Sequence, residues 1–246
     1  MLRVATRPFR IAAYFAGWLV FAVLVLPIQV VSLLLLPWAG AEPVARLVGA
    51  MIHRHSRVFV GYLRATGLLR LHVDPAARRL PAGILVANHP GLIDALLLFA
   101  QQPGLRCIYK SSLRRHPLLS AIPRAAGFIA NDEGIGLLRA TAAAARRHPV
   151  LVFPEGTRTA AGARLNPLKP GFVLAARRAG VPVRILALRT GAAFLAKDRA
   201  WWHAPALPVA LEIVTGPELH PAPARPAAES AEEVERALLA LLPAAA

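Results

Sequence analysis

The run of residues 11–41 carries no charged side chain, and it constrains the chain more than any other feature. A helix needs about 20 apolar residues to span a bilayer, and this run is longer. Pro27 interrupts it and Pro37 ends it, and a proline inside a helix removes a hydrogen bond and kinks the axis. No small-x-small cleavage site follows cleanly. The run therefore predicts helix in contact with a membrane rather than a signal peptide.

Basic residues on both sides of this run limit how it can meet the membrane. Arginines precede it and a histidine- and arginine-rich cluster follows it, so both flanks favour the cytoplasmic face. A kinked, re-entrant or shallow helical pair fits this better than one clean crossing. We expect helices over 9–36 and 43–66 at the cytoplasmic membrane, with the rest of the chain facing the cytoplasm. The residues expected to point inward from the second helix are Val44, Leu47, Val48, Met51 and Ile52.

The composition narrows the classes of partner. The 246 residues are 56% hydrophobic, with a mean hydropathy of +0.49 and a formal net charge of +16. Such a positive field suits an anionic membrane surface or an anionic substrate. The arginine-rich stretches lack the pattern of a nucleic-acid reader, so we expect no nucleic-acid partner. The single cysteine, Cys107, excludes an internal disulfide and offers no paired metal spacing, so we expect no metal site.

From residue 69 onward, short apolar segments alternate with helical patterns. This alternation predicts an α/β fold, with a mostly parallel twisted sheet flanked by helices. The chain would divide into membrane-docking helices at 1–66 and an α/β domain at 67–246. The predicted strands are 69–73, 83–88, 105–109, 127–131, 150–155, 182–189 and 208–216. The predicted helices are 92–101, 117–125, 135–148, 171–179 and 228–242, the last with Ser230 as its N-cap.

The first motif with chemical content is NHPGLID, residues 88–94. It follows a buried strand pattern, so His89 stands at a strand end, where α/β folds place their sites. Positions i and i+5 of one helix lie about 140° apart, but the Pro-Gly step allows a turn that brings Asp94 back onto the imidazole. That pairing fixes the tautomer and stabilises the protonated ring, as a general base requires. Asn88 could tie down the loop. Alternatively, His89 only caps the next helix.

The second motif is FPEGTRT, which follows the buried segment VLV. Its tight turn at Glu155-Gly156 leaves Arg158 free, and the guanidinium offers a planar fork for phosphate. The hydroxyls of Thr157 and Thr159 could supplement that anion site. Glu155 could orient the hydroxyl of an acceptor. As an isolated string, the motif could be a surface loop with a salt bridge, but its place after a buried strand, 61 residues beyond the histidine loop, favours a site.

Together, in this order, NHPGLID and FPEGTRT resemble the first and third motifs of the 1-acylglycerol-3-phosphate (lysophospholipid) acyltransferase family. The resemblance covers about residues 69–216. It implies a glycerolipid-acyltransferase-like catalytic domain that moves a fatty acyl group from a thioester, on acyl carrier protein or coenzyme A, to a hydroxyl of a lipid acceptor. No cofactor is implied beyond that co-substrate. No Gly-x-Ser-x-Gly elbow points to a serine nucleophile.

The resemblance also implies roles for individual residues. The catalytic histidine and aspartate of the family fall on His89 and Asp94. Lys110 matches the lysine after the second strand, and the N-terminal helices match the family's membrane-docking helices. The residues implied to bind the acceptor or its phosphate are Glu155, Gly156, Thr157, Arg158 and Lys169.

Two departures from the family pattern concern the acceptor. The second motif usually ends in Asp-Arg, with the arginine on the acceptor phosphate, whereas this chain has Ala130-Asn131. The fourth motif usually carries a second proline where this chain has Ile185. Arg124 or Arg184 could take over the phosphate. The Asn-Asp ending, with WWHAP downstream, resembles a branch of the family encoded beside specialised polyene or fatty-acid pathways.

The sequence therefore favours a membrane-associated acyltransferase in which His89 acts as base and Asp94 orients it. Two alternatives remain open. One is a lipid-binding membrane protein whose acyltransferase site is degenerate. The other is an acyltransferase of a specialised pathway with an acceptor other than a phosphatidate precursor.

Overall fold

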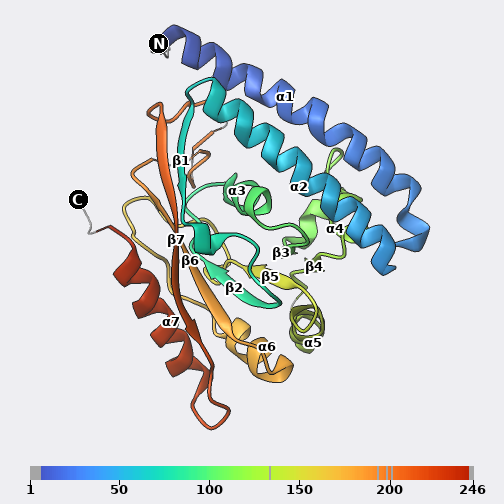
Figure 1. The fold of residues 1–246 in the computed structure, drawn as a ribbon, viewed down its shortest axis with the longest axis vertical. Helices are drawn as coiled ribbons and strands as arrows, with labels where there is room; N and C mark the ends of the chain where they lie inside the picture. The colour runs from blue at the N-terminus through green and yellow to red at the C-terminus, as the bar shows by residue number, and fades with distance from the viewer. Residues whose placement is uncertain (1–6, 133, 193, 198, 201, 244–246) are drawn as a thin grey trace.

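Figure 1 shows the chain as a computed structural model, which describes residues 7–132, 134–192, 194–197, 199–200 and 202–243. Two long N-terminal helices lie side by side and cross an α/β body, whose sheet carries helices on both faces. The predicted fold class, a helix-flanked sheet preceded by a helical pair, is confirmed.

Within the described residues the sheet has seven strands: β1 (Leu69–Val73), β2 (Gly83–Ala87), β3 (Arg106–Tyr109), β4 (Ile129–Ala130), β5 (Pro149–Val152), β6 (Val183–Thr190) and β7 (Val209–Leu219). Their order in space is β1-β7-β6-β2-β5-β3-β4. Every neighbouring pair is parallel except β6 and β7, which are antiparallel. The sheet is thus mostly parallel, as predicted, and β1 and β7 run against the other five strands. The fully buried β2 lies at its centre.

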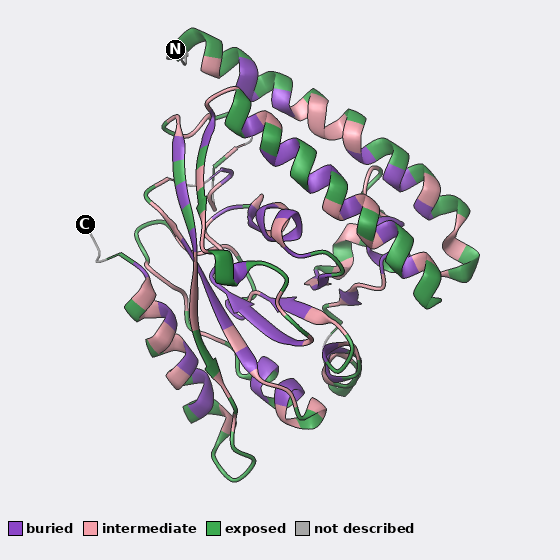
Figure 2. Ribbon diagram, in the orientation of Figure 1, coloured by how far each residue is buried: buried purple, intermediate pink, exposed green. Residues whose placement is uncertain are grey.

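In the part of the chain that the structure describes, the N-terminal pair is followed by the α-helices α3 (Asp94–Gln101), α4 (Ile122–Ala125), α5 (Ile135–Ala145), α6 (Gly171–Ala179) and α7 (Ala227–Leu241). Short 3-10 turns η1, η2 and η3 cover Leu36–Trp38, Pro75–Ala77 and Ser111–Arg115. Successive strand residues point to opposite faces, so Leu85 joins the core under α3 and Val86 joins the core under α6. Figure 2 shows the central strands buried between these two layers.

The N-terminal helices are α1 (Arg7–Leu34) and α2 (Glu42–Ala65), which confirms the predicted pair. α1 continues through Pro27 instead of being interrupted there. Its 28 residues reach about 42 Å at the α-helical rise. By length and composition α1 could cross a membrane, and 28% of its most apolar window is buried inside the protein.

The inward face of α2 differs in one position from the predicted set. Val48 and Ile52 are buried, and Val44 and Met51 are partly buried. Leu47, expected inside, is 50% exposed. At about 100° per residue, the buried stripe of α2 lies on the other side of the helix from Leu47.

Polar contacts fasten the helical pair to the α/β body. Glu42, at the start of α2, pairs with the buried Arg106 of β3 at 3.3 Å and with His148 at 3.5 Å. Gln29 of α1 donates to the Ser120 hydroxyl at 2.9 Å. Buried residues of α1, α2 and the sheet belong to one hydrophobic cluster. The division into 1–66 and 67–246 stays a prediction.

Two local predictions are wrong. The helix expected over 117–125 is α-helical only from Ile122, because Pro123 occupies the first turn, where proline favours a helix start. Ser230 does not cap α7, whose N-cap is Pro226. Ser230 is instead buried inside the helix, where its hydroxyl accepts a hydrogen bond from Arg177 at 2.9 Å.

Candidate active site

The loop after β2 brings a histidine and an aspartate together at the carboxyl edge of the sheet. Nδ1 of His89 lies 2.9 Å from Oδ2 of Asp94, and the same oxygen accepts the Gly91 amide at 2.7 Å. α3 begins at Asp94, so the turn ahead of the helix returns this carboxylate to the imidazole. The predicted contact is confirmed, whereas the catalytic roles of the two residues stay predictions.

The main chain before this loop is tied to the neighbouring strand. Asn88 is buried, and its side chain makes two hydrogen bonds with the main chain of Leu188 in β6. Nδ2 of Asn88 donates to the Leu188 carbonyl at 3.0 Å, and Oδ1 accepts the Leu188 amide at 2.8 Å. Asn88 therefore ties down the loop, as predicted, through its side chain, directly after Ala87, the last β2 residue that pairs with β6.

The imidazole of His89 is also held on its flat face. The Phe153 ring stacks on it with ring centroids 4.1 Å apart and planes 15° apart. The His89 side chain keeps 17% of its surface exposed, and Nε2 makes no hydrogen bond within the described part of the chain. One ring nitrogen thus faces Asp94, and the other is available to a substrate.

Glu155 does not occupy the place expected for an acceptor ligand. The carboxylate is buried, and its Oε1 accepts the His89 amide at 2.8 Å and the Thr159 hydroxyl at 2.9 Å. Oε2 accepts the Asn166 amide at 2.9 Å. The interpretations that Glu155 orients an acceptor hydroxyl and that the Thr159 hydroxyl faces an anion are not borne out, because both groups bond inward to the protein.

Arg158 does not stand free, which corrects the sequence prediction. Its Nη1 donates to the carbonyl oxygens of Leu195 at 2.5 Å and Ala196 at 3.1 Å, in the connection between β6 and β7. The Arg158 side chain is half-buried, and its positive charge acts to lower the pKa of Asp94. Nη2 and Nε have no partner among the described residues, so one edge of the guanidinium remains for an anion.

The turn at Gly156 lies directly against Lys169. Gly156 has φ +69°, in the left-handed region that glycine tolerates, and a Cβ there would lie 3.3 Å from both Cε and Nζ of Lys169. Thr157 is exposed beside it. Gly156, Thr157 and Lys169 therefore form one exposed cationic corner of the loop, adjoining Arg158.

The supporting residues Lys110 and Asn131 lie further along the same sheet edge. Both are exposed, at the ends of β3 and β4, and the Asn131 amide donates to the Tyr109 carbonyl at 2.8 Å. β5 separates them from His89, and neither forms a hydrogen bond or ion pair with it within the described residues.

Neither arginine proposed as a substitute for the missing phosphate ligand meets this site. Arg184 lies near the beginning of β6, at the opposite sheet edge, where it pairs with Glu218 at 2.6 Å. That interpretation is wrong for Arg184. Arg124 is exposed on α4 and forms no hydrogen bond or ion pair with the motif residues in the described structure.

Burial governs the electrostatics of both site carboxylates. Burial raises the pKa of Asp94, against the opposing effects of His89, the Gly91 amide and Arg158. Burial likewise raises the pKa of Glu155, against the hydrogen bonds from the Asn166 and His89 amides and the Thr159 hydroxyl. In each case the donors around the carboxylate oppose the cost of burying its charge.

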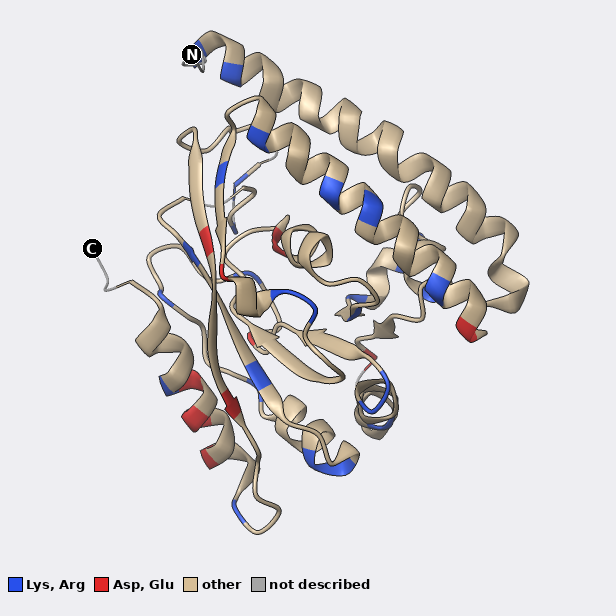
Figure 3. Ribbon diagram, viewed as in Figure 1, with Lys and Arg blue, Asp and Glu red and all other residues tan. Residues whose placement is uncertain are grey.

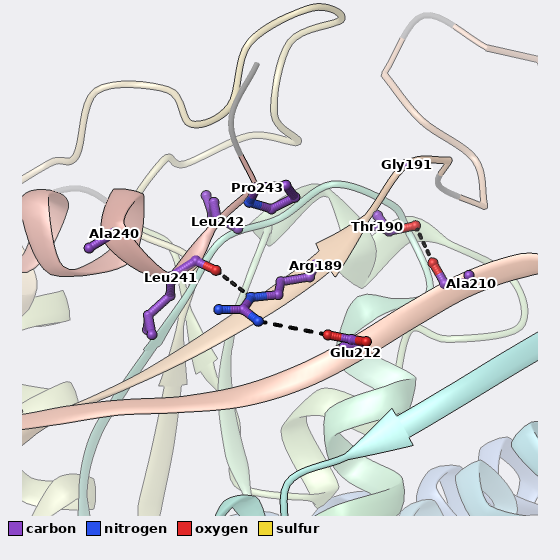
Figure 4. A pocket seen from close by; sticks show the side chains of 9 residues that line it. All are labelled: Arg189, Thr190, Gly191, Ala210, Glu212, Ala240, Leu241, Leu242 and Pro243. Atoms are coloured by element: carbon purple, nitrogen blue, oxygen red, sulfur yellow. Dashed lines mark hydrogen bonds and ion pairs between the residues drawn. The ribbon is translucent and has the colours of Figure 1, made fainter. Parts of the chain in front are cut away.

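A separate hollow of about 500 Å³ opens between β6, β7 and the end of α7, and none of the predicted site residues lines it. In Figure 4, Arg189 reaches the Leu241 carbonyl and lies 3.8 Å from Glu212. The first contact ties the end of α7 to β6, and the second joins β6 to β7. Within the described residues, no group of three potential metal ligands comes together.

Two residues that hold the site together, Phe153 and Asn166, are not among the predicted site residues. The apolar segment VLVF could have indicated Phe153, because an aromatic side chain at its end must pack either on the core or on the adjoining loop. Asn166 lies in an irregular segment with no pattern that could have indicated it. Its side-chain amide donates to the Arg158 carbonyl at 3.1 Å, and its oxygen accepts the Ala160 amide at 3.2 Å.

Comparison with known proteins connects this site to a family. A family model described as Acyltransferase matches residues 70–211, more than half of the chain. The fold is similar to the crystal structure of the 1-acyl-sn-glycerophosphate (LPA) acyltransferase PlsC from Thermotoga maritima, with a TM-score of 0.69 and 20% identity over 92% of each chain. No curated protein matches the sequence. The chain belongs to the acyltransferase family.

Proposed function

We propose that this protein is a membrane-associated O-acyltransferase that moves a fatty acyl group from an acyl-carrier-protein or coenzyme A thioester to a hydroxyl of a lysophospholipid-like acceptor. The observation that carries the proposal is the His89–Asp94 contact of 2.9 Å, with Nε2 available beside the FPEGTRT loop. The resemblance of both motifs to those of lysophospholipid acyltransferases supports the choice of substrate class.

The chemistry follows from the two nitrogens of the His89 ring. With Nδ1–H donated to Asp94, Nε2 carries the lone pair that removes the acceptor's hydroxyl proton. The acceptor oxygen bonds to the thioester carbonyl carbon, and the tetrahedral intermediate then breaks its carbon–sulfur bond. The imidazolium, stabilised by Asp94, returns the proton to the departing thiolate. The products are the acylated acceptor and a free thiol.

The acceptor would be held by the cationic corner of the loop. Arg158 keeps one edge of its guanidinium open, Lys169 lies against the Gly156 turn, and Lys110 is exposed further along the edge. These cations suit a phosphate-bearing acceptor. The neutral, exposed Asn131 motivates the second candidate, a specialised-pathway acceptor without that phosphate.

A membrane surface is the proposed setting because of the outer face of α1. Large apolar side chains recur there every three or four residues, one stripe of a helix, and Figure 2 shows much of α1 exposed or half-buried. Partitioning such side chains into lipid stabilises attachment by roughly 1.5–3 kcal/mol for each one fully buried. The stripe comprises Ile11, Phe15, Leu19, Val23, Leu26, Val30, Leu33 and Leu34.

The distribution of charged residues also indicates how the protein would be oriented on a membrane. α2 exposes arginines next to α1, whereas the acidic residues of α7 lie on the far side of the sheet (Figure 3). On an anionic surface, attraction of the first and repulsion of the second would both favour α7 pointing away from the lipid. We therefore propose attachment to the inner face of the cytoplasmic membrane. The α2 arginines are Arg46, Arg54, Arg57 and Arg64.

The test of the proposed function is product analysis. Purified protein on anionic liposomes is incubated with acyl-coenzyme A or acyl carrier protein thioester, and with lysophosphatidate or its dephosphorylated counterpart. Mass spectrometry should detect a new ester with at least one acceptor. Binding of lipid without any ester would contradict the proposal and favour the degenerate, lipid-binding alternative.

A deletion strain separates the two acceptor classes. Loss of phosphatidate-derived lipids would favour the phosphate-bearing acceptor. Loss of one minor acylated product, with those lipids normal, would favour the specialised acceptor.

A further inference from the structure

The buried carboxylate of Glu155 receives three hydrogen bonds from three different parts of the loop region. The donors are the His89 amide, the Thr159 hydroxyl and the Asn166 amide, all between 2.8 and 2.9 Å from a carboxylate oxygen. A carboxylate suits this position because both of its oxygens accept and neither donates. An amide side chain would turn an N–H group toward one of these donors.

The main chain of His89 is thereby fixed from both sides. Its amide donates to Glu155, and its carbonyl accepts the Thr159 amide at 2.8 Å. Asp94 holds the edge of the ring and Phe153 its face. The histidine backbone is thus joined to the FPEGTRT loop independently of its side-chain contacts.

Asn166 joins the same loop to the rest of the protein. Its side chain bonds to the main chain of Arg158 and Ala160, and its own amide reaches Glu155. The segment around it is anchored on α7, because Glu235 accepts the Leu168 amide at 3.3 Å and the Arg164 guanidinium donates to carbonyls at the helix end. The loop therefore has a rigid support away from the substrate side.

We propose that Glu155, Thr159 and Asn166 are positioning residues, which fix the backbone of His89 and the Arg158 turn relative to each other rather than binding the acceptor. The inference rests on the proposed function. A displacement of about 1 Å at a reacting group can lower turnover roughly 100-fold, so loss of the hydrogen bonds around Glu155 has a direct kinetic consequence. We therefore expect loss of kcat with little change in the KM of the acceptor.

The test compares Glu155→Gln, Thr159→Val and Asn166→Ala with the wild type and with Glu229→Gln, an exchange of the same chemistry on the exposed face of α7. We expect kcat to fall about 100-fold in Glu155→Gln and about tenfold in the other two, with the acceptor KM within about twofold of wild type. Thr159→Ser, which keeps the hydroxyl, should restore most of the turnover. The control should match the wild type.

Hydrogen exchange of the His89 amide gives a second readout that does not depend on activity. The amide should be protected in the wild type and exchange faster in Glu155→Gln, at unchanged global stability. A large rise in acceptor KM with kcat unchanged would overturn the proposal and assign Glu155 to acceptor binding. The proposal would also be overturned if Glu155→Gln left both turnover and the exchange rate of the His89 amide unchanged. If Glu155→Gln does not fold, unchanged turnover in Thr159→Val would overturn it instead.

The proposed function fails in a distinguishable way. In that case the wild type itself forms no ester with any thioester tested. That result would remove the positioning role as well, even with the His89 amide protected.

Discussion

Replacing Asp94 with asparagine separates the charge of this side chain from its shape. Oδ2 of Asp94 lies 2.9 Å from the His89 nitrogen and 2.7 Å from the Gly91 nitrogen, inside a site where the side chain is 2% exposed. Asparagine can keep one oxygen in that place. The perturbation therefore removes the carboxylate charge that stabilises the imidazolium formed during proton transfer.

The size of the kinetic effect follows from that distance. Taking the two charge centres as about 4 Å apart, with an effective dielectric constant of about 20, the interaction is about 4 kcal/mol. At 1.36 kcal/mol for each factor of ten, kcat should fall about 10³-fold. That value lies within the range of about 10²–10⁴ typical of general acid–base catalysis.

Stability should respond differently from turnover. Burial raises the folded-state pKa of Asp94 above its unfolded value, so the native protein binds more protons between the two values. Stability from this group is therefore greatest below the unfolded pKa and falls as pH rises through the folded one. At neutral pH the neutral asparagine avoids the cost of burying a charge, and the free energy of unfolding should change by less than about 1 kcal/mol.

The assay is thiol release during acyl transfer, with circular dichroism of thermal unfolding on the same samples. Glu212→Asn, on the opposite face of the sheet, is a control for introducing an amide. Turnover of Asp94→Asn within about threefold of wild type would show that the Asp94 charge does not stabilise the imidazolium. A loss of turnover explained by unfolding would contradict the expected stability of the variant.

Three further perturbations test the surroundings of this pair. Phe153→Leu should lower kcat about three- to tenfold, because an aromatic pair contributes about 0.5–1.5 kcal/mol. An unchanged kcat would show that stacking of Phe153 on His89 has no role in turnover. Arg158→Ala should raise the acceptor KM about 10–150-fold, since hydrogen bonds to charged groups contribute about 1.5–3 kcal/mol, and an unchanged KM in steady-state titrations would contradict anion binding there. The double change Leu19→Glu and Val23→Glu should abolish liposome cosedimentation while leaving the melting temperature intact, because both side chains lie on the exposed α1 stripe; retained cosedimentation would rule out lipid contact through that stripe.

Local covalent and helical geometry explains what the sequence predicted well. The Pro-Gly step between His89 and Asp94 excludes a continuous helix, so the return of the carboxylate could be argued from neighbouring residues alone. Asn88 could be placed because it directly follows a buried strand. The mostly parallel sheet likewise follows from strands alternating with helices, although the reversed direction of β7 depends on a long connection that carries no directional signal.

Contacts made by distant segments explain what the sequence could not predict. The guanidinium of Arg158 donates to carbonyl oxygens that lie 37 and 38 residues later in the chain. No local sequence pattern shows which distant carbonyl groups will lie near this side chain. The inward orientation of Glu155 depends partly on the His89 amide, which lies 66 residues earlier in the chain, so the local motif alone favours an acceptor ligand. Leu47 was misplaced because the inward face of α2 is decided by the helices packed on it, α1 and α3.

The most direct test of the central claim, that His89 is the base of an acyl transfer, is the turnover number of His89→Ala beside that of His220→Ala, an exposed histidine outside the site. Thiol release and ester formation are measured together for both variants on the same liposomes. We expect at least a 100-fold loss of both signals in His89→Ala and none in His220→Ala. Wild-type turnover in a folded His89→Ala protein would contradict it.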